Sequence, residues 1–233
     1  MRISFKAAKD IKTRKRYPFG TTRAAEFSTD GYREFTSDKD AEEWGHDRYG
    51  AWADNYLRTM RHIRFQASED ASPFASIPLE RYCGYDYRHM NNWLRNGEGT
   101  EEIVVRSNLL NYLLLSTDRI TENLLLWRHI PKDTLDMILD YQERYEHHFL
   151  EKGFLSTSLV KDSCARNSNS REVLLKIYAK APLHGLYVNT VCRRDETELL
   201  IEPFTNLLVD PLSEKDENGS EVHKAFLWKD TII

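Results

Sequence analysis

Cysteine is scarce in this sequence, and no long apolar run is present. The three cysteines, Cys83, Cys164 and Cys192, lie far apart and form no CxxC pair, so neither a structural zinc site nor a disulfide framework is indicated. The longest apolar stretch, Leu109–Leu115, is interrupted by an asparagine and a tyrosine. It falls short of the roughly 18 residues that a membrane span requires. The sequence therefore predicts no membrane span.

An excess of charge of one sign is also missing. Lysine and arginine together number 33 and aspartate and glutamate 37, which gives a formal net charge of -4. Such a chain has no overall field that would gather nucleic acid, so a nucleic-acid partner is disfavoured. The basic stretch at residues 2–16 lacks the apolar segment that follows the positive end of a secretory signal. We therefore expect the protein in the cytoplasm, unless another export route or a removed leader is involved.

The organisation of the chain is that of one α+β domain. Its 233 residues, 40% hydrophobic and 30% charged, suit a folded globular unit of ordinary size. We expect a basic arm at 1–35, a helical lobe at 36–117 and a β core at 118–233. The arm is either solvated, as is usual for a charge run, or laid over the domain. Apolar residues at helical spacing predict helices at Asp38–Ile63, Leu79–Leu94, Glu101–Leu115 and Asp133–Leu150. Short apolar runs predict strands at Leu124–Ile130, Phe154–Leu159, Val173–Tyr178, Leu199–Ile201, Leu207–Val209 and Phe226–Ile233.

Three stretches place polar groups inside apolar strands, where burial is costly without a partner. Arg128 lies near the end of the first strand, and its planar guanidinium suits a phosphate. Ser156 and Ser158 share one face of the second, with Thr157 on the other. The third stretch is Glu196-Thr197-Glu198, with both carboxylates on one face. Taken singly, these stretches also fit a surface ion pair, strand-edge hydroxyls and two solvated carboxylates.

Taken together, the stretches resemble the arginine-serine-glutamate class of mono-ADP-ribosyltransferases, which includes the enzymatic components of clostridial binary toxins. The aromatic-Arg, Ser-Thr-Ser and Glu-x-Glu motifs of that class occur here in the same order. The resemblance extends to the helical region, through Asp40-Ala41-Glu42-Glu43-Trp44-Gly45 and the spaced residues Tyr82, Tyr87, Asn91 and Arg95.

The resemblance implies an NAD cleft, with NAD as the substrate, between two mainly antiparallel β-sheets and the helical lobe. Arg128 would then grip the NAD pyrophosphate, and Arg171 would add a second phosphate contact. The other cofactor-binding residues implied are Tyr87, Asn91, His129, Ser156, Thr157 and Ser158. No metal is expected, because the adjacent His147 and His148 point in different directions.

The catalytic residues implied are Glu198, Glu196 and Ser156. Ser156 would hold Glu198, and that carboxylate would stabilise the cationic sugar formed as nicotinamide departs. Glu196 would face an acceptor arginine on a target protein, with actin first and small GTPases second among the expected targets. Two alternatives stay open: an NAD⁺ glycohydrolase with water as acceptor, and a catalytically silent binding module of the same fold.

Overall fold

The computed structural model describes residues 5–66, 78–165, 172–192 and 196–230. Its described strands form a mixed eight-stranded sheet in the order β2-β7-β8-β4-β1-β3-β6-β5. The strands are β1 (Leu124–Pro131), β2 (Phe149–Glu151), β3 (Leu155–Ser158), β4 (Glu172–Ala179), β5 (Gly185–Tyr187), β6 (Glu198–Ile201), β7 (Thr205–Lys215) and β8 (Glu221–Trp228). Helices precede most strands in the chain, so the α+β class is confirmed.

The sheet differs from the two separate sheets that the resemblance implies. Strand β1 pairs with β4 along its whole length, yet it meets β3 at the single pair Trp127–Ser158. This junction joins one half, β2-β7-β8-β4-β1, to the other, β3-β6-β5. Neighbouring strands are antiparallel except for β4 and β8, which are parallel. The two expected sheets are thus the halves of one hydrogen-bonded sheet, because a single ladder pair is enough to connect them.

The helical lobe consists of α3 (Asp38–Gln66), α4 (Pro78–Arg81), α5 (Tyr87–Asn96) and α6 (Glu101–Leu115). Local sequence signals determine where α5 ends and where α6 begins. Gly97 stops α5 at a φ of 75°, a left-handed conformation that glycine adopts without strain. Thr100 caps α6 by accepting a hydrogen bond from the amide of Ile103. None of the described helices is both long and apolar enough to span a bilayer.

The second predicted helix is helical over its whole length but contains a wider turn. A π-helical turn, Tyr82–Asp86, separates α4 from α5. Asp86 is buried and accepts hydrogen bonds from Arg81, at 3.0 Å, and from Arg106 of α6, at 2.7 Å. These charge-assisted bonds stabilise the wider turn. Turns of this kind often occur at functional sites.

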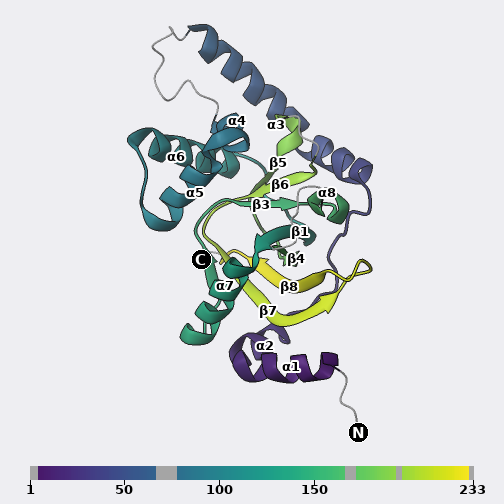
Figure 1. Cartoon of the computed structure of the whole chain (residues 1–233). Helices are drawn as coiled ribbons and strands as arrows, with labels where there is room; N and C mark the ends of the chain where they lie inside the picture. The colour runs from purple at the N-terminus through teal and green to yellow at the C-terminus, as the bar shows by residue number, and fades with distance from the viewer. Residues whose placement is uncertain (1–4, 67–77, 166–171, 193–195, 231–233) are drawn as a thin grey trace.

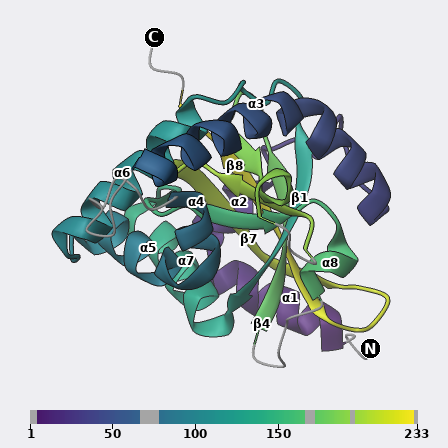
Figure 2. The same cartoon turned by 90° about the horizontal axis from the view of Figure 1, so that it is seen from above.

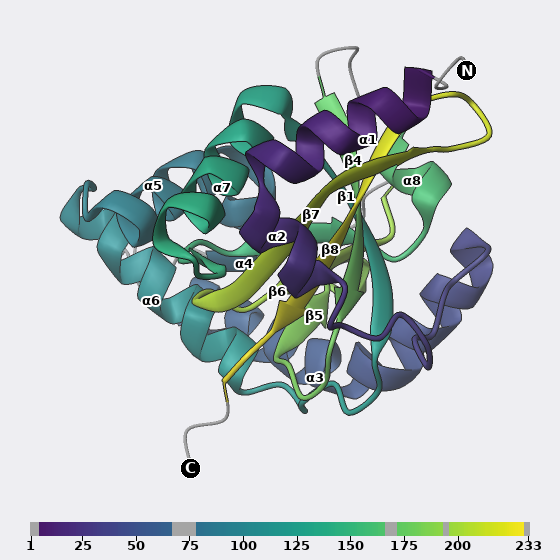
Figure 3. The same ribbon diagram turned by 90° about the horizontal axis from the view of Figure 1, so that it is seen from below.

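The described part of the N-terminal segment is laid over the domain rather than extended into solvent, because it folds onto the sheet as two helices. Helices α1 (Phe5–Arg16) and α2 (Pro18–Ala24) cross β7 on the face seen from below (Figure 3). Tyr17 is buried and donates a hydrogen bond to Asp140 of α7 (Lys132–Tyr145). Phe19 and Phe27 pack against a second apolar cluster on the sheet that includes Phe226. The aromatic residues that anchor this segment do not recur at a helical period. The sequence of the segment therefore shows mainly its basic charges and gives no sign that it packs on the sheet.

Candidate functional site

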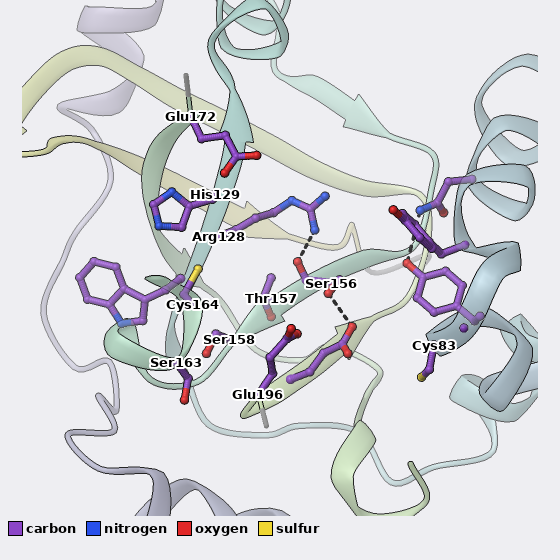
Figure 4. Close-up of a pocket in the computed structure, with 16 residues that line it drawn as sticks. Cys83, Arg128, His129, Ser156, Thr157, Ser158, Ser163, Cys164, Glu172 and Glu196 are labelled. Carbon is purple, nitrogen blue, oxygen red and sulfur yellow. Dashed lines mark hydrogen bonds between the residues drawn. The ribbon is translucent and has the colours of Figure 1, made fainter. Parts of the chain in front are cut away.

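A pocket of about 410 Å³ lies where β1 and β3 separate beyond their single pair (Figure 4). That volume falls within the ~300–1,000 Å³ range of small-molecule sites. Both halves of the sheet, the helical lobe and α8 (Lys161–Ala165) contribute to its walls. The lining residues are Tyr82, Cys83, Gly84, Tyr87, Asn91, Trp127, Arg128, His129, Ser156, Thr157, Ser158, Ser163, Cys164, Glu172, Glu196 and Glu198.

Ser156 connects the arginine and glutamate motifs at the centre of this pocket. Its hydroxyl donates to Oε1 of Glu198 at 2.5 Å, while its backbone carbonyl accepts from Nη1 of Arg128 (Figure 4, dashed lines). One residue of β3 therefore fixes the guanidinium on one side and the carboxylate on the other. Arg128, Ser156 and Glu198, which lie far apart in the sequence, are therefore linked by a continuous series of hydrogen bonds.

The two carboxylates of the Glu-x-Glu motif both line the pocket. Glu198 begins β6, pairs with Ser158 of β3 and is 3% exposed. Glu196 lies two residues before the strand, is half-buried and points into the same space (Figure 4). The pocket therefore contains one shielded carboxylate, Glu198, and one more accessible carboxylate, Glu196, so the two groups can take different chemical roles.

The other two residues of the Ser-Thr-Ser motif line the pocket, but their hydroxyls donate to backbone carbonyls. Thr157 Oγ1 donates to the carbonyl of Leu199 at 2.7 Å. Ser158 Oγ donates to the carbonyl of Val160 at 2.7 Å. Both hydroxyls therefore hold β3 against its surroundings, whereas Ser156 is the member of the motif that contacts a glutamate.

The helical lobe supplies one wall of the pocket. Tyr87 lies at its rim and is 40% exposed, while Asn91 is buried behind it. The Asn91 side chain accepts from the amide of Phe154 at 2.8 Å and donates to its carbonyl and to the Tyr82 hydroxyl, each at 3.3 Å. Asn91 thus ties α5 to the residue before β3, which fixes the distance between the helical wall and the Ser-Thr-Ser strand.

His129 lies near Cys164 in the pocket (Figure 4), and Trp127 also lines it. Both ring nitrogens of His129 and the indole Nε1 of Trp127 are buried without a hydrogen-bond partner among the described residues. Burial lowers the pKa of His129, so its ring is neutral at pH 7 and offers one donor and one acceptor. Burial raises the pKa of the Cys164 thiol to about 11. That thiol is therefore protonated.

Several lining residues were not among the predicted site residues. Tyr82 is fully buried, and burial, followed by the negative charge of Glu198, raises its pKa well above the usual range. Its place in the Tyr82-x4-Tyr87 spacing was a signal that could have identified it. Glu172, Ser163 and Cys164 lie in no motif, because only the fold brings them to the pocket.

The predicted phosphate contact Arg171 lies outside the described residues. Among the described residues, no cluster of three His, Cys, Asp or Glu side chains could hold a metal ion.

Comparison with known proteins agrees with this geometry. The family profile described as ADP-ribosyltransferase exoenzyme matches residues 41–226. No curated protein sequence matches the chain significantly. The fold is similar to the ADP-ribosylating toxin BECa of a C. perfringens binary enterotoxin, solved with NADH, at a TM-score of 0.60 and 16% identity. The match covers 84% of this chain and 50% of BECa, so the chain spans half the length of that toxin.

Two shorter proteins match over nearly their whole length. The S. aureus C3stau2 structure with NAD has a TM-score of 0.61 at 15% identity, covering 86% of this chain and 100% of that one. The C3 exoenzyme of Clostridium limosum has a TM-score of 0.60 at 17% identity, covering 86% and 98%. The fold is that of the toxin-type ADP-ribosyltransferases, a family that uses NAD as its substrate. The chain belongs to the ADP-ribosyltransferase exoenzyme family.

Proposed function

We propose that this enzyme transfers ADP-ribose from NAD⁺ to an arginine side chain of a target protein and releases nicotinamide. The observation that carries the proposal is the shared pocket of Arg128, Ser156, Glu196 and Glu198. The pocket combines a guanidinium for phosphate, a held carboxylate for positive charge, and a second carboxylate for an acceptor.

The first step is cleavage of the bond between ribose C1′ and the nicotinamide nitrogen. The bonding electron pair leaves with nicotinamide, and C1′ acquires the positive charge of an oxocarbenium ion. Glu198, held by Ser156 and 3% exposed, stabilises this charge in a low-dielectric site. Arg128 holds the pyrophosphate, because its fork can donate parallel hydrogen bonds to phosphate oxygens. We assign supporting contacts with NAD to Tyr87, Asn91, His129, Thr157 and Ser158, which line the same pocket.

The second step is attack on C1′ by a guanidine nitrogen of the acceptor. Glu196 pairs with the incoming guanidinium and takes the proton that the nitrogen loses as the new C–N bond forms. A carboxylate suits this partner better than an amide would, because it can accept two parallel charge-assisted hydrogen bonds. Arginine is therefore the favoured acceptor.

Glu198→Gln and Glu196→Gln test this assignment in one assay. Labelled NAD is incubated with each variant and either a cell lysate or agmatine, a small guanidinium acceptor. Nicotinamide release and acceptor labelling are then measured. Glu198→Gln should lower kcat for both products about 100- to 1,000-fold with little change in KM for NAD, because its charge acts in the transition state. Glu196→Gln should retain nicotinamide release to water and lose transfer.

Each other outcome has a clear meaning. Nicotinamide release that is unaffected by Glu198→Gln would contradict the mechanism. Release by the wild type without any labelled acceptor would identify an NAD⁺ glycohydrolase, and no consumption of NAD would identify a silent binding module.

The target protein is a further part of the proposal. We infer that the enzyme reaches its target outside the cell that makes it, because the family consists of exoenzymes. Actin is the first acceptor to test, since BECa belongs to a binary toxin, and small GTPases are the second. Labelling of purified actin at arginine would support the first choice, and labelling of a GTPase alone would replace it.

A further inference from the structure

The residue between the two glutamates, Thr197, has no role in the mechanism above. It is 2% exposed, and the pocket is lined by its neighbours Glu196 and Glu198 rather than by Thr197 itself. Its hydroxyl is nevertheless at the centre of a compact hydrogen-bond network. We call this network, formed by Ser158, Val160 and Thr197, the hydroxyl latch.

The donors and acceptors of the latch can be assigned from its geometry. Ser158 Oγ donates its single proton to the carbonyl of Val160 at 2.7 Å. In the contact between Ser158 Oγ and Thr197 Oγ1, at 3.0 Å, the proton must therefore come from Thr197. The amide of Val160 donates to Thr197 Oγ1 at 3.2 Å and approaches Ser158 Oγ at 3.3 Å. Each hydroxyl thus has both a donor and an acceptor role, and the network is closed.

The latch lies where the ladder between β3 and β6 ends. Ser158 pairs with Glu198, and one residue further the amide of Leu159 donates to the carbonyl of Thr197 at 2.9 Å. Glu198 is held within this ladder and by Ser156. Glu196 lies two residues before the start of β6 and is bonded to Thr197, so the backbone direction at Glu196 depends on how Thr197 is held.

We propose that Thr197 is a positioning residue that, through the hydroxyl latch, aims Glu196 at the acceptor and so sets the ratio of transfer to hydrolysis. The inference rests on the proposed function and assigns a determinant of acceptor use to the same site. Because Ser156 and the ladder hold Glu198 independently, loss of the latch should leave cleavage of NAD intact. Misplacement of a reacting group by about 1 Å can cost on the order of 100-fold in rate.

Thr197→Val tests the latch because valine keeps the shape and removes the hydroxyl. With agmatine as acceptor, transfer should fall about 10- to 100-fold, whereas nicotinamide release to water should stay within about twofold of the wild-type rate. Thr197→Ser, which keeps the hydroxyl, should restore transfer. Thr197→Ala removes the hydroxyl without placing a methyl group against Ser158. It should lower the ratio of transfer to hydrolysis as well, and it takes the place of the valine variant if that variant does not fold.

Thr117→Val is the matched control. Thr117 is 4% exposed, donates to the carbonyl of Leu114 at 2.7 Å and lies away from the pocket, so its loss should lower stability without changing the ratio. Equal losses of transfer and release in the Thr197 variants, or an unchanged ratio in folded protein, would overturn the latch alone. Absence of transfer by the wild type to both agmatine and protein would refute the proposed function, and the latch with it.

Discussion

At the scale of single residues, Ser156 determines how the two charged groups of the pocket are arranged. Its carbonyl accepts from Arg128, and its hydroxyl donates to Glu198 at 2.5 Å. The carbonyl contact depends on the backbone of β3, so side-chain replacement leaves it in place. The hydroxyl contact depends on the serine side chain, so the orientation of Glu198 can be tested separately.

Ser156→Ala should lower kcat for nicotinamide release about 10- to 100-fold, since a hydrogen bond to a charged group contributes about 1.5–3 kcal/mol. The KM for NAD should change much less, because Arg128 remains in place. Ser107→Ala is the control, as Ser107 is fully buried in α6 and bonds to the carbonyl of Ile103, away from the pocket. A Ser156→Ala enzyme with the wild-type kcat would contradict the role of this contact.

At the scale of elements, two contacts set the position of the helical lobe. Helix α3 packs on Tyr187 at the end of β5 through Gly45, at a distance that leaves no room for a side chain. Helix α5 is tied to β2 by Arg95, which donates to both carboxylate oxygens of Glu151, at 2.9 and 3.1 Å. Glu151 also accepts from the amide of Gly153 at 2.7 Å. The lobe is therefore tied to both edge strands of the sheet, β5 and β2.

Gly45→Ala should destabilise the protein, because a Cβ there would lie 2.1 Å from Cδ1 of the buried Tyr187 ring. We expect a loss of at least about 1–3 kcal/mol in the free energy of unfolding, measured by urea denaturation. Gly50→Ala in the same helix is the control, since a Cβ there meets nothing within 4 Å. That variant should gain about 0.5–1 kcal/mol from helix propensity. Equal effects of the two substitutions would contradict the packing.

Arg95→Ala should loosen the wall formed by Tyr87 and Asn91. Arg95 is partly exposed, so we expect a modest cost of about 1–2 kcal/mol. The KM for NAD should rise up to about tenfold, while kcat changes less. Asn96→Ala, at the exposed end of the same helix, should leave both constants unchanged. An unchanged KM in a folded Arg95→Ala enzyme would show that the wall does not need this ion pair.

At the scale of the whole molecule, the N-terminal helices are docked onto the sheet. Lys9 of α1 pairs with Glu221 of β8 at 2.7 Å, and Ser213 donates to the same carboxylate at 2.8 Å. Burial alone would raise the pKa of Glu221, but the hydrogen bonds from Lys9 and Ser213 outweigh it and lower that pKa to about 2. The docking of α1 therefore carries a dependence on pH.

The sign of that dependence follows from the two protonation states. The pKa of Glu221 is below its unfolded value of 4.5, so its stabilisation is complete above pH 4.5 and is lost as the pH falls towards 2. Glu221→Gln should reduce the free energy of unfolding by up to about 1 kcal/mol at pH 7, because Lys9 is exposed. The difference from wild type should shrink between pH 4.5 and pH 2 in urea denaturation curves. A constant difference across that range would contradict the assignment.

The sequence predicted those parts of the fold that depend on local patterns. Glu101–Leu115 was placed correctly from its helical period, and the Asn96-Gly97 stop ends α5 as expected. The short strands β2 and β5 were missed, because three residues carry no readable alternation. The predicted helix from Asp133 extends only to Tyr145, since Phe149–Glu151 gains more by pairing with β7.

By itself, the sequence determined the chemistry available: an arginine, a serine and two glutamates on short strands, because residue type and strand alternation are local properties. The tertiary structure alone decided which atoms meet. The Ser156 contacts with Arg128 and Glu198 join residues 28 and 42 positions apart, and the hydroxyl contact between Ser158 and Thr197 joins residues 39 apart. Such contacts follow from how strands pair across the sheet, and pairing is set by burial of the whole core rather than by any one segment.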